Sequence, residues 1–267
     1  MIKKILLSML ISTNVCATSC LERSMSELLF IDKNASYNIS AVIVTSPHRS
    51  YLYSFPDSMC KMKSTFLIKG DIAKTYLSAK GFNFINYYDK KGNLHVGWID
   101  AKAVSYMEKE PILDTPGLTA SDFSIWHNGK LLTIDNKISD VYSKAITENH
   151  SNTSMFDDFR NIHGVDYKIF HHEGGGLYIE SSNINYFALK RDFDDYRMTT
   201  IQLTSLNGIS SRGIFIGVPV KYIHYVYGKP SKIEGNNVYY RKGLSLLSFE
   251  IDKKQVIKKI SVDIIPK

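Results

Sequence analysis

Apolar and polar residues alternate with a period of two along much of the first hundred positions, a pattern that predicts short β-strands. The segment YNISAVIVTS (37–46) is rich in β-branched residues, and SYLYSFP (50–56) places Tyr51, Tyr53 and Phe55 on one face. Glycine-bearing turns punctuate the strands that follow, at Lys69-Gly70-Asp71, Ala79-Lys80-Gly81 and Lys90-Lys91-Gly92-Asn93. Closely spaced short strands joined by such turns predict a small barrel.

Three motifs follow one another in this part of the chain. They are Lys69-Gly70-Asp71-Ile72 with Tyr76 in the next strand, the aromatic run Gly81-Phe82-Asn83-Phe84-Ile85-Asn86-Tyr87, and Gly97-Trp98-Ile99. With these motifs in this order, residues 37–106 resemble a bacterial SH3-like domain. The resemblance implies a non-catalytic barrel that binds peptidoglycan or proteins.

The pattern changes after residue 106. Residues 107–121 (MEKEPILDTPGLTAS) have the composition of a linker. DFSIWHNGKLLTID (122–135) predicts two strands around an Asn-Gly turn, and residues 136–146 have apolar positions at helical spacing. The alternation returns in three segments read as strands, which are DYKIFHHEGGGLYIESS (166–182), NYFALKR (185–191) and MTTIQLTS (198–205).

The stretch SSRGIFIGVPVKYIHYVYGKP (210–230) predicts a short helix that begins near Pro219 and stops at Gly228. Two or three strands follow it, with a turn at Asp252-Lys253-Lys254. Residues 205–267 resemble exported α+β domains of the type found in the small lipoprotein of the outer-membrane barrel-assembly machinery. The residues that carry this resemblance are Arg212, Gly213, Gly217, Gly228 and Pro230. They are structural residues, so the resemblance implies a fold and no function.

These patterns predict a mainly β, α+β protein. It comprises a small SH3-like barrel, then an α+β domain with an antiparallel sheet and one or two short helices. The expected organisation is a signal peptide (1–17), an N-terminal arm (18–36), the barrel (37–106), a linker (107–121) and the α+β domain (122–267).

The first residues have the character of a secretory signal. Two lysines precede a short apolar run, Ile5 to Ile11, and Val15-Cys16-Ala17 offers small residues for cleavage. No segment is long and apolar enough for a transmembrane helix. The sequence therefore predicts an exported, periplasmic protein that begins near Thr18.

Cleavage after Ala17 removes Cys16 and leaves Cys20 and Cys60, an even pair in an oxidising compartment. We expect these two residues to form a disulfide that ties the arm to the barrel. Lipidation of Cys20 is the competing interpretation, because Ser19 precedes it. Ala17, however, stands where a lipoprotein signal usually has leucine, so the disulfide is favoured.

The net charge of +7 loses about two positive charges with the signal. Lysines and arginines are scattered, without an arginine-rich arm, so nucleic acid is not an expected partner. A moderately basic surface suits an anionic envelope surface or an acidic partner, and it equally suits a surface that only maintains solubility.

No catalytic or metal-binding pattern emerges. His171-His172-Glu173 is the nearest approach, but adjacent residues of a strand point to opposite faces and no H-E-x-x-H spacing accompanies them. Glu173-Gly174-Gly175-Gly176 lacks the residues of a phosphate loop, and the acidic clusters Asp157-Asp158 and Asp192, Asp194, Asp195 fit solvated loops. There is no G-x-S-x-G elbow. The sequence predicts no enzyme, no metal and no cofactor.

Aromatic residues with polar tips are the remaining candidates, because such residues are favoured at recognition surfaces. The predicted binding residues on the barrel are Tyr51, Tyr53, Tyr76, Tyr87, Tyr88 and Trp98. Core packing is the alternative for each of them, and for Trp98 and Phe84 the core is favoured.

Together these observations predict an exported protein that binds rather than catalyses. The leading hypothesis is an immunity protein that neutralises a periplasm-acting, cell-wall-targeting toxin, such as an effector of a type VI secretion system. A second hypothesis is a peptidoglycan-binding envelope protein without a toxin partner. A third is a cell-wall hydrolase with His171, His172, Glu173 and Asp195 in one cleft. The oligomeric state stays open.

Overall fold

The computed structural model describes residue 20 and residues 36–107, 117–127, 130–138 and 155–266. Strands dominate these residues, in three antiparallel sheets, with one α-helix among the described elements. The expected mainly β, α+β fold is confirmed. The predicted signal peptide, most of the arm, most of the linker and most of the helix expected at 136–146 lie outside the described residues. A search of the described residues finds no helix with the length and apolar character that crossing a bilayer needs.

The first sheet contains seven strands in the order β3-β2-β6-β5-β4-β1-β7. They are β1 (Ser36–Val44), β2 (Ser50–Tyr53), β3 (Lys61–Leu67), β4 (Ile72–Ala79), β5 (Phe82–Tyr88), β6 (Leu94–Asp100) and β7 (Val104–Tyr106). The 3-10 turn η1 (Ser58–Cys60) precedes β3, and η2 (Ala101–Ala103) precedes β7. The predicted turns at Gly70, Gly81 and Gly92 all have positive φ, which explains the glycines. The SH3-like resemblance of this segment stays a prediction.

This first sheet buries side chains on both of its faces. One small core lies within the sheet's own strands and contains Val42, Val44, Leu52, Leu67, Ala73, Ile85, Ile99 and Val104. The opposite side chains of the same strands belong to a second, much larger core. Phe84, for example, lies next to Ile85 in β5, yet its ring packs in that larger core with Trp98. Alternation along a strand places neighbouring residues on opposite faces, and here both faces are covered.

The described residues of the second half of the chain form two further sheets and the helix α4. The eight-stranded sheet has the order β10-β11-β12-β13-β18-β17-β16-β15, and a three-stranded sheet has the order β14-β8-β9. The elements are η3 (Ala120–Asp122), β8 (Ser124–His127), β9 (Lys130–Thr133), β10 (Met155–Ile162), β11 (Val165–Gly174), β12 (Leu177–Ser182), β13 (Arg197–Leu203), β14 (Gly208–Ser210), α4 (Lys221–Tyr227), β15 (Lys232–Glu234), β16 (Asn237–Lys242), β17 (Ser245–Ile251) and β18 (Ile257–Ile264).

Helix α4 forms where the sequence predicts it, within residues 219–228. Its buried side chains are Ile223, Val226 and Tyr227, and Gly228 ends it with a φ of 74°. Tyr227 packs against Tyr240 of β16 and Phe249 of β17, with ring centroids 5.4 and 5.5 Å away. The apolar stripe of the helix therefore packs on the eight-stranded sheet at β16 and β17.

One expected strand is wrong. Residues 185–191 (NYFALKR) form consecutive turns between β12 and β13. Asn185 and Lys190 adopt positive φ values of 62° and 54°, which a strand does not contain. The preceding hairpin follows expectation, because Gly175 and Gly176 form the turn between β11 and β12.

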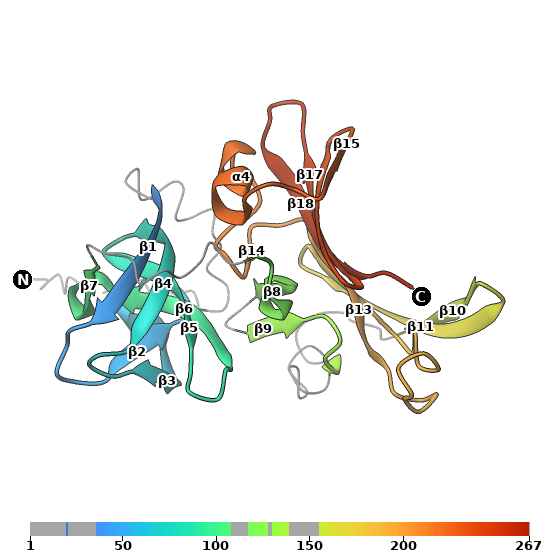
Figure 1. The fold of residues 1–267 in the computed structure, drawn as a ribbon, viewed down its shortest axis with the longest axis horizontal. Coiled ribbons are helices and arrows are strands. Elements are labelled where there is room, and N and C mark those ends of the chain that lie inside the picture. The colour runs from blue at the N-terminus through green and yellow to red at the C-terminus, as the bar shows by residue number, and fades with distance from the viewer. Residues whose placement is uncertain (1–19, 21–35, 108–116, 128–129, 139–154, 267) are drawn as a thin grey trace, which may run out of the picture.

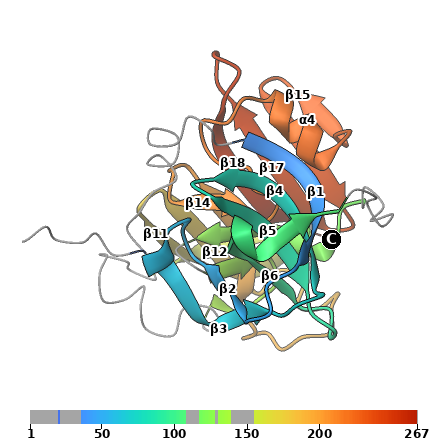
Figure 2. The same ribbon diagram turned by 90° about the vertical axis from the view of Figure 1, so that its left-hand side faces the viewer.

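A single large core joins the two halves. It includes Phe55, Tyr76, Phe84 and Trp98 from the first sheet together with residues from η3 to β18. Figure 1 shows the two large sheets at opposite ends of the long axis, with α4 and the three-stranded sheet between them. Figure 2 turns the seven-stranded sheet toward the viewer, with the strands of the eight-stranded sheet behind it. The three-stranded sheet and α4 thus lie between the two large sheets.

Candidate binding surface

Two of the six predicted binding residues belong to the core. The exposed fraction is 4% for Tyr76 and 1% for Trp98. An added Cβ on Gly213 would lie 3.4 Å from Cβ of Tyr76, so the backbone between β14 and α4 packs directly on β4. Because this face of the sheet is covered, the prediction that Tyr76 and Trp98 line an exposed groove is wrong. For Trp98 the favoured alternative, core packing, is what the structure shows.

Tyr51 lies on a surface that contains both aromatic and cationic side chains. It pairs across the β2–β3 hairpin with Phe66, and the two ring centroids are 5.7 Å apart. Lys61 Nζ is 3.6 Å from the Tyr51 centroid, and Arg49 Cζ is 4.5 Å from the Phe66 centroid. We name these four residues, Arg49, Tyr51, Lys61 and Phe66, the β2–β3 face.

The local register explains why these four groups meet. Directly opposite residues of an antiparallel pair share a face, so Tyr51 and Phe66 form one aromatic platform. Arg49 and Lys61 are exposed, and each lies over one ring of that platform. A cation over an exposed aromatic ring contributes about 0.5–1 kcal/mol. Both positive charges stay close to solvent and are held in a defined place, which suits the recognition of an acidic group.

Tyr53 lies next along β2 but has different neighbours. Its ring meets Phe82 edge-on at 5.1 Å. Partial burial, and next the negative charge of Asp100, raise the pKa of the Tyr53 hydroxyl. Tyr53 therefore stays protonated and packs at the boundary of the core.

Tyr87 and Tyr88 lie at the far end of the β5–β6 hairpin. Tyr88 is 49% exposed, and its hydroxyl is 2.6 Å from Ser121 Oγ, just before the second half of the chain. At the tip, Asp89 accepts hydrogen bonds from Asn93 and from the backbone of Lys91, and these bonds lower the pKa of its carboxyl. Internal hydrogen bonds hold this tip.

The histidine cluster separates as expected for neighbours in a strand. His171 faces Glu180 of β12, with Nε2 and Oε2 3.5 Å apart. His172 is the next residue of β11 and points to the other face. Burial, and next the charge of His171, lower the pKa of His172. Asp195 forms ion pairs with Lys137 and Arg197 instead. These contacts do not bring Asp195 together with the two histidines, as the hydrolase hypothesis requires.

The eight-stranded sheet carries a partly buried row of polar residues that no sequence pattern predicted. Arg160 donates two hydrogen bonds to Glu180, at 3.0 and 2.8 Å, and the Glu180 side chain is 6% exposed. In register with Glu180 lie Thr200 and Asp263, and Thr200 Oγ1 donates to Asp263 Oδ1 at 3.0 Å. Only the pairing of strands β10 to β13 and β18 brings these residues together, so no sequence motif marks them. Among the described residues, no group of three or more His, Cys, Asp or Glu is placed to hold a metal ion.

Asp263 makes the stability of this row depend on pH. Burial, and next the negative charge of Glu180, raise the pKa of its carboxyl from 3.8 to about 6, against the opposing hydrogen bond from Thr200. The folded protein then binds more protons than the unfolded chain between about pH 4 and 6, so the free energy of unfolding falls as the pH rises through this window.

We expect Asp263→Asn to raise the free energy of unfolding at pH 7.5 by about 2 kcal/mol, since the amide removes the cost of a buried charge. The gain should shrink as the pH falls through 6 and be nearly lost by pH 4, where the Asp263 carboxyl of the folded protein is protonated. Urea denaturation between pH 4 and 7.5 measures it. Asp192→Asn, at an exposed position, is the control. An equal effect of Asp263→Asn at every pH would contradict the prediction.

Comparison with known proteins places the chain in no family. No protein-family model matches it, and no curated protein matches it. A solved structure, the C-terminal domain of TagH, aligns with 87% of this chain and 99% of its own chain, at 8% identity and a TM-score of 0.20. A similarity at this level carries no argument about fold or function. The function of this chain is therefore inferred from its own residues.

Proposed function

We propose that this protein is an exported binding protein, specifically an immunity protein that binds and neutralises a toxin acting on the cell wall in the periplasm. The β2–β3 face is the contact that we assign to an acidic region of the toxin. The observation that carries the proposal is the placement of two exposed cations over two aromatic rings on one hairpin.

The charge of the surrounding sheet supports an acidic partner. Residues 37–106 contain nine Lys and Arg side chains against four Asp and no Glu, a surplus of five positive charges. Charges of one sign accelerate the encounter with a partner of the opposite sign. Aromatic rings beside the cations then add apolar contact area at the centre of the contact.

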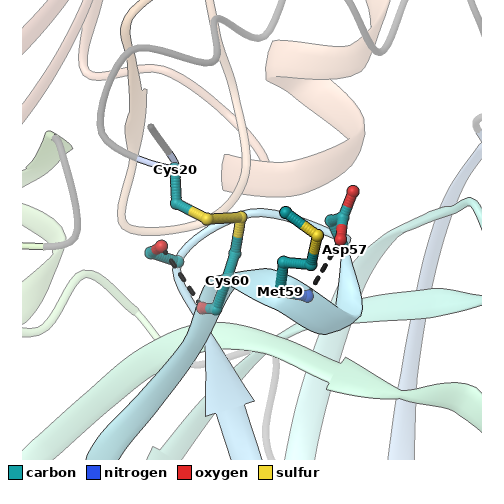
Figure 3. The surroundings of a disulfide bond; sticks show 5 residues. Cys20, Asp57, Met59 and Cys60 are labelled. Carbon is teal, nitrogen blue, oxygen red and sulfur yellow. Dashed lines mark hydrogen bonds between the residues drawn. A yellow bond between two sulfur atoms is a disulfide. The ribbon is translucent and has the colours of Figure 1, made fainter. Parts of the chain in front are cut away.

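The disulfide beside the β2–β3 face also suits an inhibitor that acts by covering a surface of the toxin. The Cys20–Cys60 disulfide joins the N-terminal arm to the turn before β3, as predicted. Figure 3 shows this bridge next to the hydrogen bond from the Met59 backbone to Asp57. Because β3 carries Lys61 and Phe66, the bridge anchors the base of the β2–β3 face. A face that is ordered before binding loses less conformational entropy when the complex forms.

Peptidoglycan is the second candidate ligand, and the observation that favours it is the SH3-like resemblance of residues 37–106. The two proposals differ in what the β2–β3 face contacts. A toxin presents a folded acidic surface and forms a one-to-one complex, whereas cell-wall material retains the protein without any protein partner.

The test uses the mature chain from Thr18, immobilised and exposed to periplasmic extract and separately to purified sacculi. We expect a stoichiometric protein partner whose cell-wall-degrading activity is inhibited. The double variant Arg49→Glu with Lys61→Glu should weaken its binding at least about tenfold, since it reverses two charges at the contact. The increase in Kd should shrink at high salt.

Lys253→Glu with Lys254→Glu is the matched control, because both lysines are exposed in the turn between β17 and β18. Equal weakening by this control would mean that net charge alone drives binding. Retention on sacculi without a protein partner would replace the immunity proposal by the peptidoglycan proposal.

A further inference from the structure

The loop between β12 and β13, residues 183–196, presents large apolar side chains to solvent. Phe187 is 82% exposed, the highest value among the exposed large hydrophobic residues described, and Phe193 and Leu189 are 40% and 36% exposed. We name this segment the Phe187 loop. Isolated apolar residues on a surface are ordinary. Three exposed apolar residues within seven positions of one loop indicate an interaction site.

Internal bonds hold the loop in one conformation. The Asn183 side chain, 1% exposed, donates to the carbonyl of Phe193 at 2.9 Å and accepts from the backbone N–H of Lys168 at 3.0 Å. Two further backbone bonds, Leu189 to Asn185 and Arg191 to Tyr186, close the turn at 2.8 Å each. Phe187 is therefore presented to solvent by a fixed backbone, which lowers the entropic cost of binding.

A second set of contacts fastens the loop to the rest of the protein. Arg191 donates two hydrogen bonds to Asp135, at 2.5 and 2.7 Å. Asp195 pairs with Lys137 at 3.0 Å, and Lys168 Nζ lies 3.7 Å from Asp194 and 5.2 Å from the ring centroid of Phe193. The loop is thus attached at both ends, while its central residues stay in solvent.

The charges of the loop indicate which partner suits it. Residues 183–196 contain Lys190 and Arg191 against Asp192, Asp194 and Asp195, a surplus of one negative charge. An anionic bilayer attracts basic segments, so this composition does not favour a membrane surface. An apolar centre with exposed side chains of both signs at its rim, Lys190 and Asp192, is the arrangement typical of protein–protein contacts.

We propose that the Phe187 loop is a docking site for a folded protein, which receives Phe187 in an apolar pocket and pairs its rim charges with Lys190 and Asp192. This inference does not depend on the proposed toxin contact. In Figure 1 the loop that leads into β13 lies at the lower right and the β2–β3 hairpin at the lower left, so the two surfaces lie toward opposite ends of the long axis.

Site-specific photo-crosslinking in the living cell tests this proposal. The photoreactive residue p-benzoylphenylalanine replaces Phe187 in one variant and Ile233 in a control. Ile233 lies in β15, an edge strand of the eight-stranded sheet that pairs with neither β12 nor β13, and is 59% exposed. We expect one discrete protein adduct from position 187 and none of that mass from position 233.

The crosslinked protein, once identified and purified, is then titrated with the intact chain. Phe187→Ser should raise its Kd about 30-fold, as truncation of a central aromatic anchor does, whereas Ile233→Ser should change it less than about twofold. Lys190→Glu with Asp192→Lys should also weaken binding, without loss of the aromatic anchor. The unfolding midpoint of each variant should equal that of the native chain.

Other outcomes overturn the proposal. Adducts with lipid only would indicate a membrane contact, adducts with a second copy of this chain would indicate self-association, and equal adducts at both positions would indicate general stickiness. An unchanged Kd for Phe187→Ser would also refute it. The Arg49→Glu, Lys61→Glu variant should keep the adduct at position 187, so failure of the toxin proposal leaves this one testable.

Discussion

Replacing Arg212 by alanine is expected to lower the free energy of unfolding by about 3–5 kcal/mol, the largest effect that we expect from a single side chain. Arg212 and Asp122 form a buried ion pair, with Nε to Oδ1 at 2.6 Å and Nη2 to Oδ2 at 2.7 Å. Their side chains are 3% and 4% exposed. Removal of the guanidinium leaves a carboxylate without its cationic partner in the interior, and that uncompensated charge sets the size of the loss.

Arg212 has further partners besides Asp122. Its Nη1 also donates to the Val226 carbonyl at 3.2 Å, and its guanidinium lies 5.0 Å from the Tyr227 ring centroid. Burial alone would lower the pKa of Arg212, but the hydrogen bonds and charge of Asp122 outweigh it and raise the pKa. Burial, and next the charge of Asp122, raise the pKa of Tyr227 to about 12, so its hydroxyl stays protonated and donates to Ser210.

Arg191→Ala is the matched control for this prediction. Arg191 makes a similar two-bond contact with Asp135, but the side chains are 24% and 41% exposed. We therefore expect a loss of only about 0–1 kcal/mol from this pair, as for partly exposed ion pairs in general. Urea denaturation at neutral pH measures both variants. Equal losses from the two variants would mean that burial does not determine how much the Arg212–Asp122 pair contributes to the free energy of unfolding.

Loss of the disulfide is expected to have a comparable effect. Cys20 and Cys60 are 40 positions apart, and their Cα atoms are 5.4 Å apart. A cross-link that closes a loop of this size stabilises a protein by about 4 kcal/mol, chiefly because it restricts the unfolded chain. Cys20→Ala should therefore lower the free energy of unfolding by about 3–4 kcal/mol. Cys20 is the better position to change, since it is only partly buried, whereas Cys60 is 3% exposed.

The measurement compares urea denaturation of the mature chain with and without reductant. The Cys20→Ala variant should be insensitive to reductant, and the reduced native chain should match its stability. Thiol labelling of the exported protein provides the chemical check, because a bridged pair has no free thiol. A labelled Cys60, or a lipid on Cys20, would contradict the bridge and restore the competing interpretation.

Local patterns in the sequence were sufficient where one short segment carries the whole signal. The helix at residues 219–228 combines an apolar stripe with Gly228, whose positive φ ends the helix. The turns at Gly70, Gly81 and Gly92 follow from the same conformational freedom. The count of cysteines after signal cleavage was enough to predict the Cys20–Cys60 bridge.

Local patterns failed where a distant segment decides the outcome. NYFALKR alternates like a strand, but the buried side chain of Asn183, bonded to Phe193 and Lys168, holds residues 183–196 as turns. Tyr76 has the spacing of an exposed strand residue. Its burial depends on Gly213, more than a hundred positions away, which packs against it.

The sequence by itself determined the β-rich architecture, the short helix and the pairing of the two cysteines, because periodicity, turn glycines and residue counts act over short distances. Only the tertiary structure decided which strand faces are covered, since one core joins both halves. It also placed Arg49 and Lys61 over Phe66 and Tyr51, Arg160 against Glu180, and Phe187 at the tip of a fixed loop. Each of these arrangements depends on strand register and packing between segments far apart in the chain, and alternation along one segment carries no information about either.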